Sequence, residues 1–166
     1  MDHKELWMRE TDRDHRDDYR RWLWLADEPD AVTAYWGQGV LWAFGVGEEM
    51  VAAALMLSSE HGTELMVEIK NIAVAPLWQG HGIGHRVISD LVEYYRVRGY
   101  RIMVVKTANS SLRNLAFYQT AGFRMDSIQR DFFTASHGYP TTLIENGIVM
   151  RDLVRFTRDL SAEGTL

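Results

Sequence analysis

Residues 74–84 read Val-Ala-Pro-Leu-Trp-Gln-Gly-His-Gly-Ile-Gly, and this stretch decides the fold. It follows an apolar run that predicts a strand, and the apolar residues after Gly84 recur at helical spacing. A glycine-rich turn between a strand and a helix leaves backbone N–H groups free at the positive end of the helix dipole, which is typical of a phosphate or pyrophosphate site. His85 stands where the dinucleotide-binding pattern G-x-G-x-x-G needs its last glycine, and no Gly-Lys-Ser/Thr follows to form a P-loop. A purely structural turn is the alternative interpretation of these glycines.

The segments on either side of this turn predict a single mixed α/β layer. Upstream, residues 40–46, 51–58 and 65–74 read as strands joined by short turns, which is typical of an antiparallel meander. Downstream, a helix that closes at Gly99 leads to a strand at 100–107, so this strand should pair in parallel with 65–74 through a right-handed crossover. The remaining expected elements are a strand at 5–11, helices at 12–26 and 29–37, a helix from Ser110 or Ser111 to Gly122, and strands at 123–133 and 148–156 after a turn at Asn146-Gly147.

The composition is that of one domain spanning residues 1–166. Its 166 residues are 46% hydrophobic and include 19 aromatic side chains (6 Trp, 7 Tyr and 6 Phe), which excludes intrinsic disorder. The absence of cysteine excludes disulfides, thiolate metal sites and a cysteine nucleophile. The longest apolar run, residues 50–57, is too short to cross a bilayer, and the first residues lack the apolar segment of a secretory signal. We therefore expect a cytoplasmic protein with no membrane partner.

Charge is distributed unevenly along the chain. Residues 1–76 carry 15 acidic and 7 basic side chains, whereas residues 77–130 carry 3 acidic and 8 basic ones. A basic middle in a protein of net charge −5 favours a local anionic ligand over a nucleic-acid surface, which would usually raise the charge of the whole domain. The alternative is that these basic side chains are merely solvated.

The pattern Gln-x-x-Gly-x-Gly that begins at Gln79, after a strand ending in Val-x-Pro, resembles the acetyl-CoA loop of the GNAT N-acetyltransferases. The resemblance continues through the strand at 102–105, the run Asn109-Ser110-Ser111, and residues 117–123, which are similar to the family segment Leu/Phe-Tyr-x-x-x-Gly-Phe. It covers residues 66–127 in order and spacing. It implies the GNAT fold, an α/β (α+β) domain whose mixed, mostly antiparallel sheet has a central splayed parallel strand pair and helices on both faces. Residues 131–133 and 145–148 further resemble a branch of small, stand-alone bacterial GNAT proteins.

The resemblance implies acetyl-CoA as the cosubstrate. In that family the splayed strand ends hold the pantetheine arm and the loop amides bind the pyrophosphate. The residues carried over are Ile72, Ala73, Val74, Gln79, Gly80, His81, Gly82, Ile83 and Gly84, with Arg86 nearby. One departure concerns the family asparagine seven residues before the tyrosine, which is Ser111 here, and Asn109 is the alternative contact. His81 and His85 lack a third ligand, so we expect no metal.

Without cysteine, direct attack of an amine on the thioester is the simplest chemistry. It requires oxyanion stabilisation, for which the resemblance implies the Val74 backbone N–H, and a proton for the departing thiolate. Tyr118 is the candidate general acid. On a helical wheel it shares a face with Ser111 and Asn114, and the alternative is a tyrosine that only packs at the end of the helix.

Glu68 is the candidate general base. It stands eleven residues before Gln79, a spacing that resembles the histone-acetyltransferase branch. Strict alternation along the strand would place it on one face with Met66, Lys70, Ile72 and Val74. The alternative is a solvated ion pair between Glu68 and Lys70.

The acceptor is expected to be a small-molecule primary amine. The first two helices usually wall the acceptor site in GNAT proteins, and an aromatic, acidic wall would suit a cationic amine. Its residues would be Trp22, Trp24, Trp36, Asp27, Glu28 and Asp30, and His137 lies in a later loop that often lines such sites. The alternatives are a peptide or protein N-acetyltransferase and a non-catalytic acyl-CoA-binding sensor or interaction domain. A homodimer that uses the last strand as its exchange surface is also open.

Overall fold

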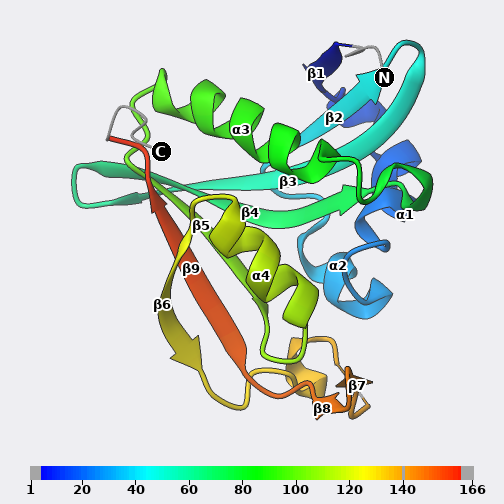
Figure 1. Ribbon diagram of the computed structural model, residues 1–166, viewed down its shortest axis with the longest axis vertical. Helices are drawn as coiled ribbons and strands as arrows, with labels where there is room; N and C mark the ends of the chain where they lie inside the picture. The colour runs from blue at the N-terminus through cyan, green and yellow to red at the C-terminus, as the bar shows by residue number, and fades with distance from the viewer. Residues whose placement is uncertain (1–4, 140, 162–166) are drawn as a thin grey trace.

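The computed structural model describes residues 5–139 and 141–161, which form one seven-stranded sheet with helices on both faces (Figure 1). The strand order is β1-β2-β3-β4-β5-β9-β6, antiparallel except where β4 and β5 run parallel. The strands are β1 (Leu6–Glu10), β2 (Val40–Val46), β3 (Glu49–His61), β4 (Glu64–Val74), β5 (Ile102–Ala108), β6 (Arg124–Gln129) and β9 (Leu153–Asp159), beside a small hairpin of β7 (Ile144–Glu145) and β8 (Ile148–Val149). The helices are η1 (Arg13–Tyr19), α1 (Arg20–Leu23), α2 (Pro29–Tyr35), η2 (Pro76–Trp78), α3 (Ile83–Arg96), α4 (Leu112–Thr120) and η3 (Ala135–His137).

Each face of the sheet buries its own hydrophobic cluster. α3 contributes an apolar stripe at helical spacing (Val87, Ile88, Leu91 and Tyr95), and this stripe packs with Tyr118 of α4 on one face. On the opposite face, Leu23 of α1 and Val32 and Tyr35 of α2 pack against Leu41 and Leu55 of the sheet. We refer to these as the α3/α4 face and the α1/α2 face. No helix among the described residues is long and apolar enough to cross a membrane.

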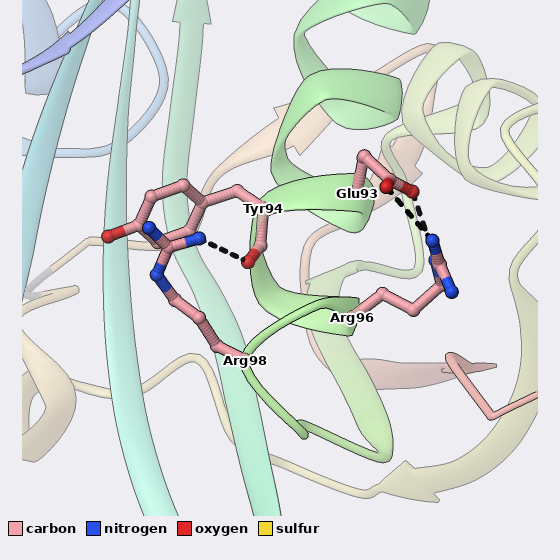
Figure 2. A network of polar contacts seen from close by, with 4 residues as sticks. All are labelled: Glu93, Tyr94, Arg96 and Arg98. Atoms are coloured by element: carbon pink, nitrogen blue, oxygen red, sulfur yellow. Dashed lines mark hydrogen bonds and ion pairs between the residues drawn. The ribbon is translucent and has the colours of Figure 1, made fainter.

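The C-terminal end of α3 is fastened by charged side chains (Figure 2). Arg98 Nη1 donates to the Tyr94 carbonyl oxygen at 2.9 Å, and its guanidinium lies 3.4 Å from the centroid of the Tyr94 ring. Arg96 donates to both carboxylate oxygens of Glu93 at 2.9 Å. Arginines near a helix C-terminus satisfy its last carbonyls and complement its dipole. This network is structural, because it lies at the end of α3 opposite the glycine-rich loop, about 20 Å away for a helix of this length.

The two parallel strands separate into a fork. β4 and β5 are paired only from Met66–Ile102 to Ile69–Val105, although β4 continues to Val74 and β5 to Ala108. Figure 1 shows β4 running toward α1 while β5 runs toward the β7–β8 hairpin and the antiparallel β9 returns from it. The splayed parallel pair expected from the sequence is therefore present.

A β-bulge stands where the fork opens. Leu55 of β3 faces Asn71, but the next residue, Met56, faces Ile69, so Lys70 is an extra residue in β4. Before the bulge Ile69 packs on the α3/α4 face, and after it Ile72 packs on that same face. The expectation that Glu68 shares a face with Ile72 and Val74 is therefore wrong. Glu68 lies on the α1/α2 face, because the bulge reverses the alternation.

Two other segments differ from expectation. The helix expected at 12–26 is a 3-10 helix followed by the short α1, and Arg16, buried in it, donates to the carbonyl oxygens of Gln38 and Gly39. The last strand starts at Leu153 instead of 148, because the N–H groups of residues 151 and 152 donate to Asn109 Oδ1 instead of joining the sheet. Asn146-Gly147 forms the expected turn, with φ of 54° and 75°, but it joins β7 to β8.

Candidate active site

Two glycines in left-handed backbone conformations shape the loop between β4 and α3. Gly80 and Gly82 both have φ of 79°, and an added Cβ at either would meet nothing within 4 Å. Gln79 fixes the loop at both ends, because Nε2 donates to the Val74 carbonyl at 3.0 Å and Oε1 accepts from Arg113 Nη1 at 3.1 Å. The amide of Gln79 is thus used inside the protein, and the open side of the loop is backbone that leads into the N-terminus of α3. That arrangement suits an anion.

α3 and α4 meet beside this loop. A Cβ on Gly84 would lie 3.0 Å from the Phe117 ring, so a larger residue there would require the ring to move by a few tenths of an ångström. The exposed ring of His85 lies with Nε2 2.9 Å from Thr120 Oγ1 and meets Phe117 edge-on at 4.8 Å. Arg86 forms an ion pair with Asp90 on its own helix. His81 is exposed and Ile83 half-buried in the same region.

The backbone of β4 presents alternate residues to the fork. Ala75 donates its N–H to the Val51 carbonyl of β3 at 2.8 Å, so Ala75 and Ala73 direct their peptide groups toward β3. Val74 and Ile72 therefore direct theirs to the other edge, where β5 has moved away. The alternation therefore directs the peptide groups of Ile72 and Val74 into the fork, as expected, whereas those of Ala73 face β3.

Tyr118 is the buried residue of α4 and lies on the α3/α4 face of the fork. Its ring packs 5.2 Å from Phe117 and 5.9 Å from Phe156. Burial raises the pKa of the Tyr118 hydroxyl above its ordinary value, so the group stays protonated. It is an O–H donor, as a general acid must be. The raised pKa of the Tyr118 hydroxyl also lies further above the pKa of a thiol. Proton donation to the sulfur is therefore favourable only as negative charge develops on the leaving sulfur.

Glu68 lies across the fork, on the α1/α2 face, with its side chain 21% exposed. Its Oε2 accepts from Lys106 Nζ at 3.2 Å, so its partner is the lysine where β5 leaves β4. The alternative pair with Lys70 is not the one that forms, since the Lys70 ammonium lies 4.8 Å from the centroid of the Tyr35 ring. The second carboxylate oxygen of Glu68 accepts no hydrogen bond that the described residues donate.

The β7–β8 hairpin packs against the N-terminal end of α4. Ser111 Oγ donates to Glu145 Oε2 at 2.5 Å, which uses the hydroxyl that replaces the asparagine of the family pattern. Asn109 Oδ1 accepts the N–H groups of residues 151 and 152, and its Nδ2 donates to the Val149 carbonyl. Ser111 and Asn109, the two polar side chains expected near the cosubstrate, thus hold the segment after β6 in place. The contact of either side chain with acetyl-CoA stays a prediction.

Trp22 and Trp36 pack against the hydrophobic cluster of the α1/α2 face, but the aromatic side chains that contact an acidic group there are tyrosines. Arg20 already covers Trp36 at 3.9 Å, and Trp24 is 48% exposed. Instead, Asp27 accepts from the hydroxyls of Tyr35 and Tyr139, each at 2.9 Å.

A polar residue of β4 extends this group of side chains. Asn71 Nδ2 donates to the Tyr35 hydroxyl and to the Leu23 carbonyl, each at 2.9 Å. Burial, followed by the Asp27 carboxylate, raises the pKa of both Tyr35 and Tyr139. His137 lies apart, with its ring stacked on Phe132 at 4.3 Å. Sequence reasoning missed Asn71, although a polar residue inside an apolar strand is a signal in itself.

These residues fit an extended acyl thioester that carries phosphate. The loop offers open backbone at a helix N-terminus, and beside it the fork offers strand edges of β4 and β5 that do not pair with each other. Among the described residues, no three His, Asp or Glu side chains are placed to share a metal ion.

Comparison with known proteins identifies relatives of this site. Residues 3–123 match the model of the acetyltransferase (GNAT) family. An N-acetyltransferase of Bacillus subtilis, the uncharacterised protein YvbK, is 36% identical over 139 residues, which cover 83% of this chain and 86% of that protein.

Two solved structures share the fold along nearly the whole chain. An acetyltransferase from Bacillus subtilis in complex with CoA superposes with a TM-score of 0.81 at 33% identity, covering 93% of this chain and 99% of that one. A GNAT family acetyltransferase from Elizabethkingia anophelis with acetyl-CoA bound gives a TM-score of 0.81 at 30% identity, with coverages of 93% and 97%.

Proposed function

The chain belongs to the GNAT family of acetyltransferases, and from this premise we propose that it acetylates a small, cationic primary amine directly from acetyl-CoA. Its class is that of an acyltransferase, and solved relatives hold CoA or acetyl-CoA. The observation that carries the proposal is the fork, which has the Tyr118 hydroxyl on one face and the Glu68 carboxylate on the other.

The loop and the fork divide the binding of acetyl-CoA between them. The backbone of residues 79–84 receives the pyrophosphate, and Ile72 and Val74 receive the pantetheine arm at the peptide edge that β5 has left. Because Val74 stands at the wide end of the fork, beside the loop, the acetyl carbonyl lies next to the Val74 N–H, and Lys70 and Lys106 mark the narrow end beyond it. Acetyl-CoA supplies the acetyl group as a thioester.

The residues around the thioester then serve an addition and an elimination. A neutral amine nitrogen attacks the carbonyl carbon, and the Val74 N–H stabilises the charge that develops on the carbonyl oxygen. The C–N bond forms and the C–S bond breaks. The nitrogen gives one proton to Glu68 through intervening water, because Glu68 precedes Val74 by six residues of β4, and the leaving sulfur takes one from the Tyr118 hydroxyl. Solvent exchange restores both groups, and the products are the N-acetylated amine and free CoA.

The α1/α2 face supports the choice of a cationic acceptor. The acidic residues 27, 28 and 30 lie in or beside α2, and Asp27 is held by two tyrosine hydroxyls. This face already binds one primary ammonium group, because Lys70 Nζ lies over the ring of Tyr35. A lysine of a peptide or protein presents the same chemical group and is the alternative acceptor.

Two measurements on the unmodified protein test the proposal. Thermal unfolding is followed with acetyl-CoA, CoA, NAD and ATP, and a ligand at 100 times its Kd should add about 2.7 kcal/mol, or several degrees. Release of CoA thiol is then followed with butylamine, 1,4-diaminobutane, β-alanine and a lysine-containing peptide. Stabilisation by acetyl-CoA and CoA alone, with fastest turnover of the diamine, supports the proposal. Stabilisation without turnover of any amine would indicate a non-catalytic acyl-CoA-binding domain.

A further inference from the structure

Asn71 carries a buried acceptor that nothing in the described part of the chain satisfies. The residue is 5% exposed, and its Oδ1 has no hydrogen-bond partner among the described residues. The orientation of the amide is fixed, because Nδ2 already donates to the Leu23 carbonyl and to the Tyr35 hydroxyl. A buried amide oxygen without a donor is costly and rare in folded proteins. An N–H donor that arrives from outside would remove that cost.

The partners of Asn71 strengthen this acceptor. Asp27 accepts a hydrogen bond from the Tyr35 hydroxyl, and the Tyr35 oxygen in turn accepts one from Asn71 Nδ2. Hydrogen bonds in such a chain polarise one another. Donation from Nδ2 toward a carboxylate shifts electron density onto the amide oxygen. Asn71 Oδ1 therefore presents more negative charge than an isolated amide.

Asn71 also stands where the acceptor must arrive. It is the residue after the bulge, at the point where β4 and β5 separate, and it projects to the α1/α2 face. Tyr118 and α3, the helix that follows the glycine-rich loop at residues 79–84, lie on the opposite face. The ring that holds Asn71 through its hydroxyl is the same ring that carries the Lys70 ammonium. The Lys70 ammonium thus shows that the face of the Tyr35 ring can hold a primary ammonium group.

We propose that Asn71 Oδ1 and the ring of Tyr35 form the subsite that receives the amine of the acceptor, and that the Lys70 ammonium occupies the Tyr35 ring until the acceptor displaces it. The inference rests on the proposed function and names the residues that hold its second substrate. The amine donates one N–H to Asn71 Oδ1, which directs its lone pair away from Asn71 and toward the fork.

The test uses variants whose effects have opposite signs. Asn71→Ala should raise the KM for 1,4-diaminobutane about ten- to hundredfold, the range for a hydrogen bond to a charged group. Lys70→Met should lower that KM severalfold, because it removes a competing ammonium. Tyr35→Phe and Tyr139→Phe are matched, since each removes one hydroxyl that Asp27 accepts at 2.9 Å. Of this pair, Tyr35→Phe should raise the KM, because the Tyr35 hydroxyl also accepts from Asn71 Nδ2. Tyr139→Phe should leave the KM within about twofold.

The Kd for CoA, measured by calorimetry, separates the two substrates. It should stay unchanged in all four variants, and an equal loss in CoA affinity and amine KM in Asn71→Ala would overturn the proposal in favour of a contact with pantetheine. A rise in KM in Lys70→Met would also overturn it.

A measurement on the unmodified protein covers the cases in which Asn71→Ala does not fold or no amine turns over. The side-chain amide resonance of Asn71 should shift when 1,4-diaminobutane is added to the CoA complex. An unshifted resonance contradicts the subsite. A shift without turnover would instead leave the subsite standing and remove the proposed reaction.

Discussion

Tyr118 is a core residue to which the proposed reaction gives a second role, that of proton donor. Its ring packs against Phe117 and Phe156, within the hydrophobic cluster of the α3/α4 face. Tyr118→Phe keeps the ring and removes the proton donor. We expect turnover to fall roughly ten- to ten-thousandfold with acetyl-CoA affinity preserved. Steady-state rates and calorimetry check this, and unchanged turnover would remove Tyr118 from the mechanism.

The raised pKa of Tyr118 has a consequence for the pH dependence. A group whose pKa is raised keeps its proton to higher pH, so the acid form persists beyond the ordinary phenol value of about 10. We expect the kcat of the unmodified protein to rise toward alkaline pH, as the amine loses its proton, without a falling limb below about pH 10. A pH–rate profile with saturating acetyl-CoA measures this. A decline that begins near pH 8 would mean that another acid is in use.

Residues of this kind differ in how far the sequence could predict them. Tyr118 and Val74 could be proposed from the sequence because each stands in a spaced motif, Val74 directly before the loop and Tyr118 in the run at 117–123. Asn71, Tyr35 and Lys106 were not, because their roles come from partners that the fold supplies. The hydroxyl of Tyr139 that meets Asp27 lies 112 residues away along the chain, and no local pattern reports such a contact.

At the scale of elements, the loop between β4 and α3 depends on two left-handed glycines. Gly80→Ala adds no clash but forces an L-residue to φ near 79°, which costs about 1–2 kcal/mol. Gly62→Ala is a matched control, because Gly62 has φ of 64° with equally open space in the β3–β4 turn. We expect similar losses of stability in both variants and a weaker Kd for CoA in Gly80→Ala alone. Equal CoA affinities would mean that the loop does not bind the pyrophosphate.

The bulge in β4 is the element that sequence reasoning could not supply. In residues 65–74 the apolar positions change from 67 and 69 to 72 and 74 across the polar pair Lys70-Asn71, and only the pairing with β3 shows that this break is a bulge. The bulge changes which face of the sheet carries the residues of the proposed site. Without the reversal at Lys70, Glu68 would face the same side as Ile72. With it, the carboxylate and Asn71 share the α1/α2 face.

At the scale of the molecule, the sheet separates two chemistries. The α3/α4 face carries the anion loop and the basic residues of α3 and α4, whereas the α1/α2 face is built from the acidic first part of the chain. The uneven charge of the sequence therefore becomes two sides of one fork. An anionic cosubstrate and a cationic acceptor can approach the same thioester without crossing each other's field.

This separation predicts how salt affects the two amine classes. Attraction between exposed charges weakens as the Debye length falls from about 30 Å at 0.01 M to about 3 Å at 1 M ionic strength. At saturating acetyl-CoA, we expect the KM for 1,4-diaminobutane to rise severalfold across this range and that for butylamine to rise less. The zwitterion β-alanine, whose carboxylate the acidic face repels, should show a flat or falling KM. Initial rates at matched pH measure all three, and a best substrate that is acidic or zwitterionic at low salt would contradict a cationic acceptor.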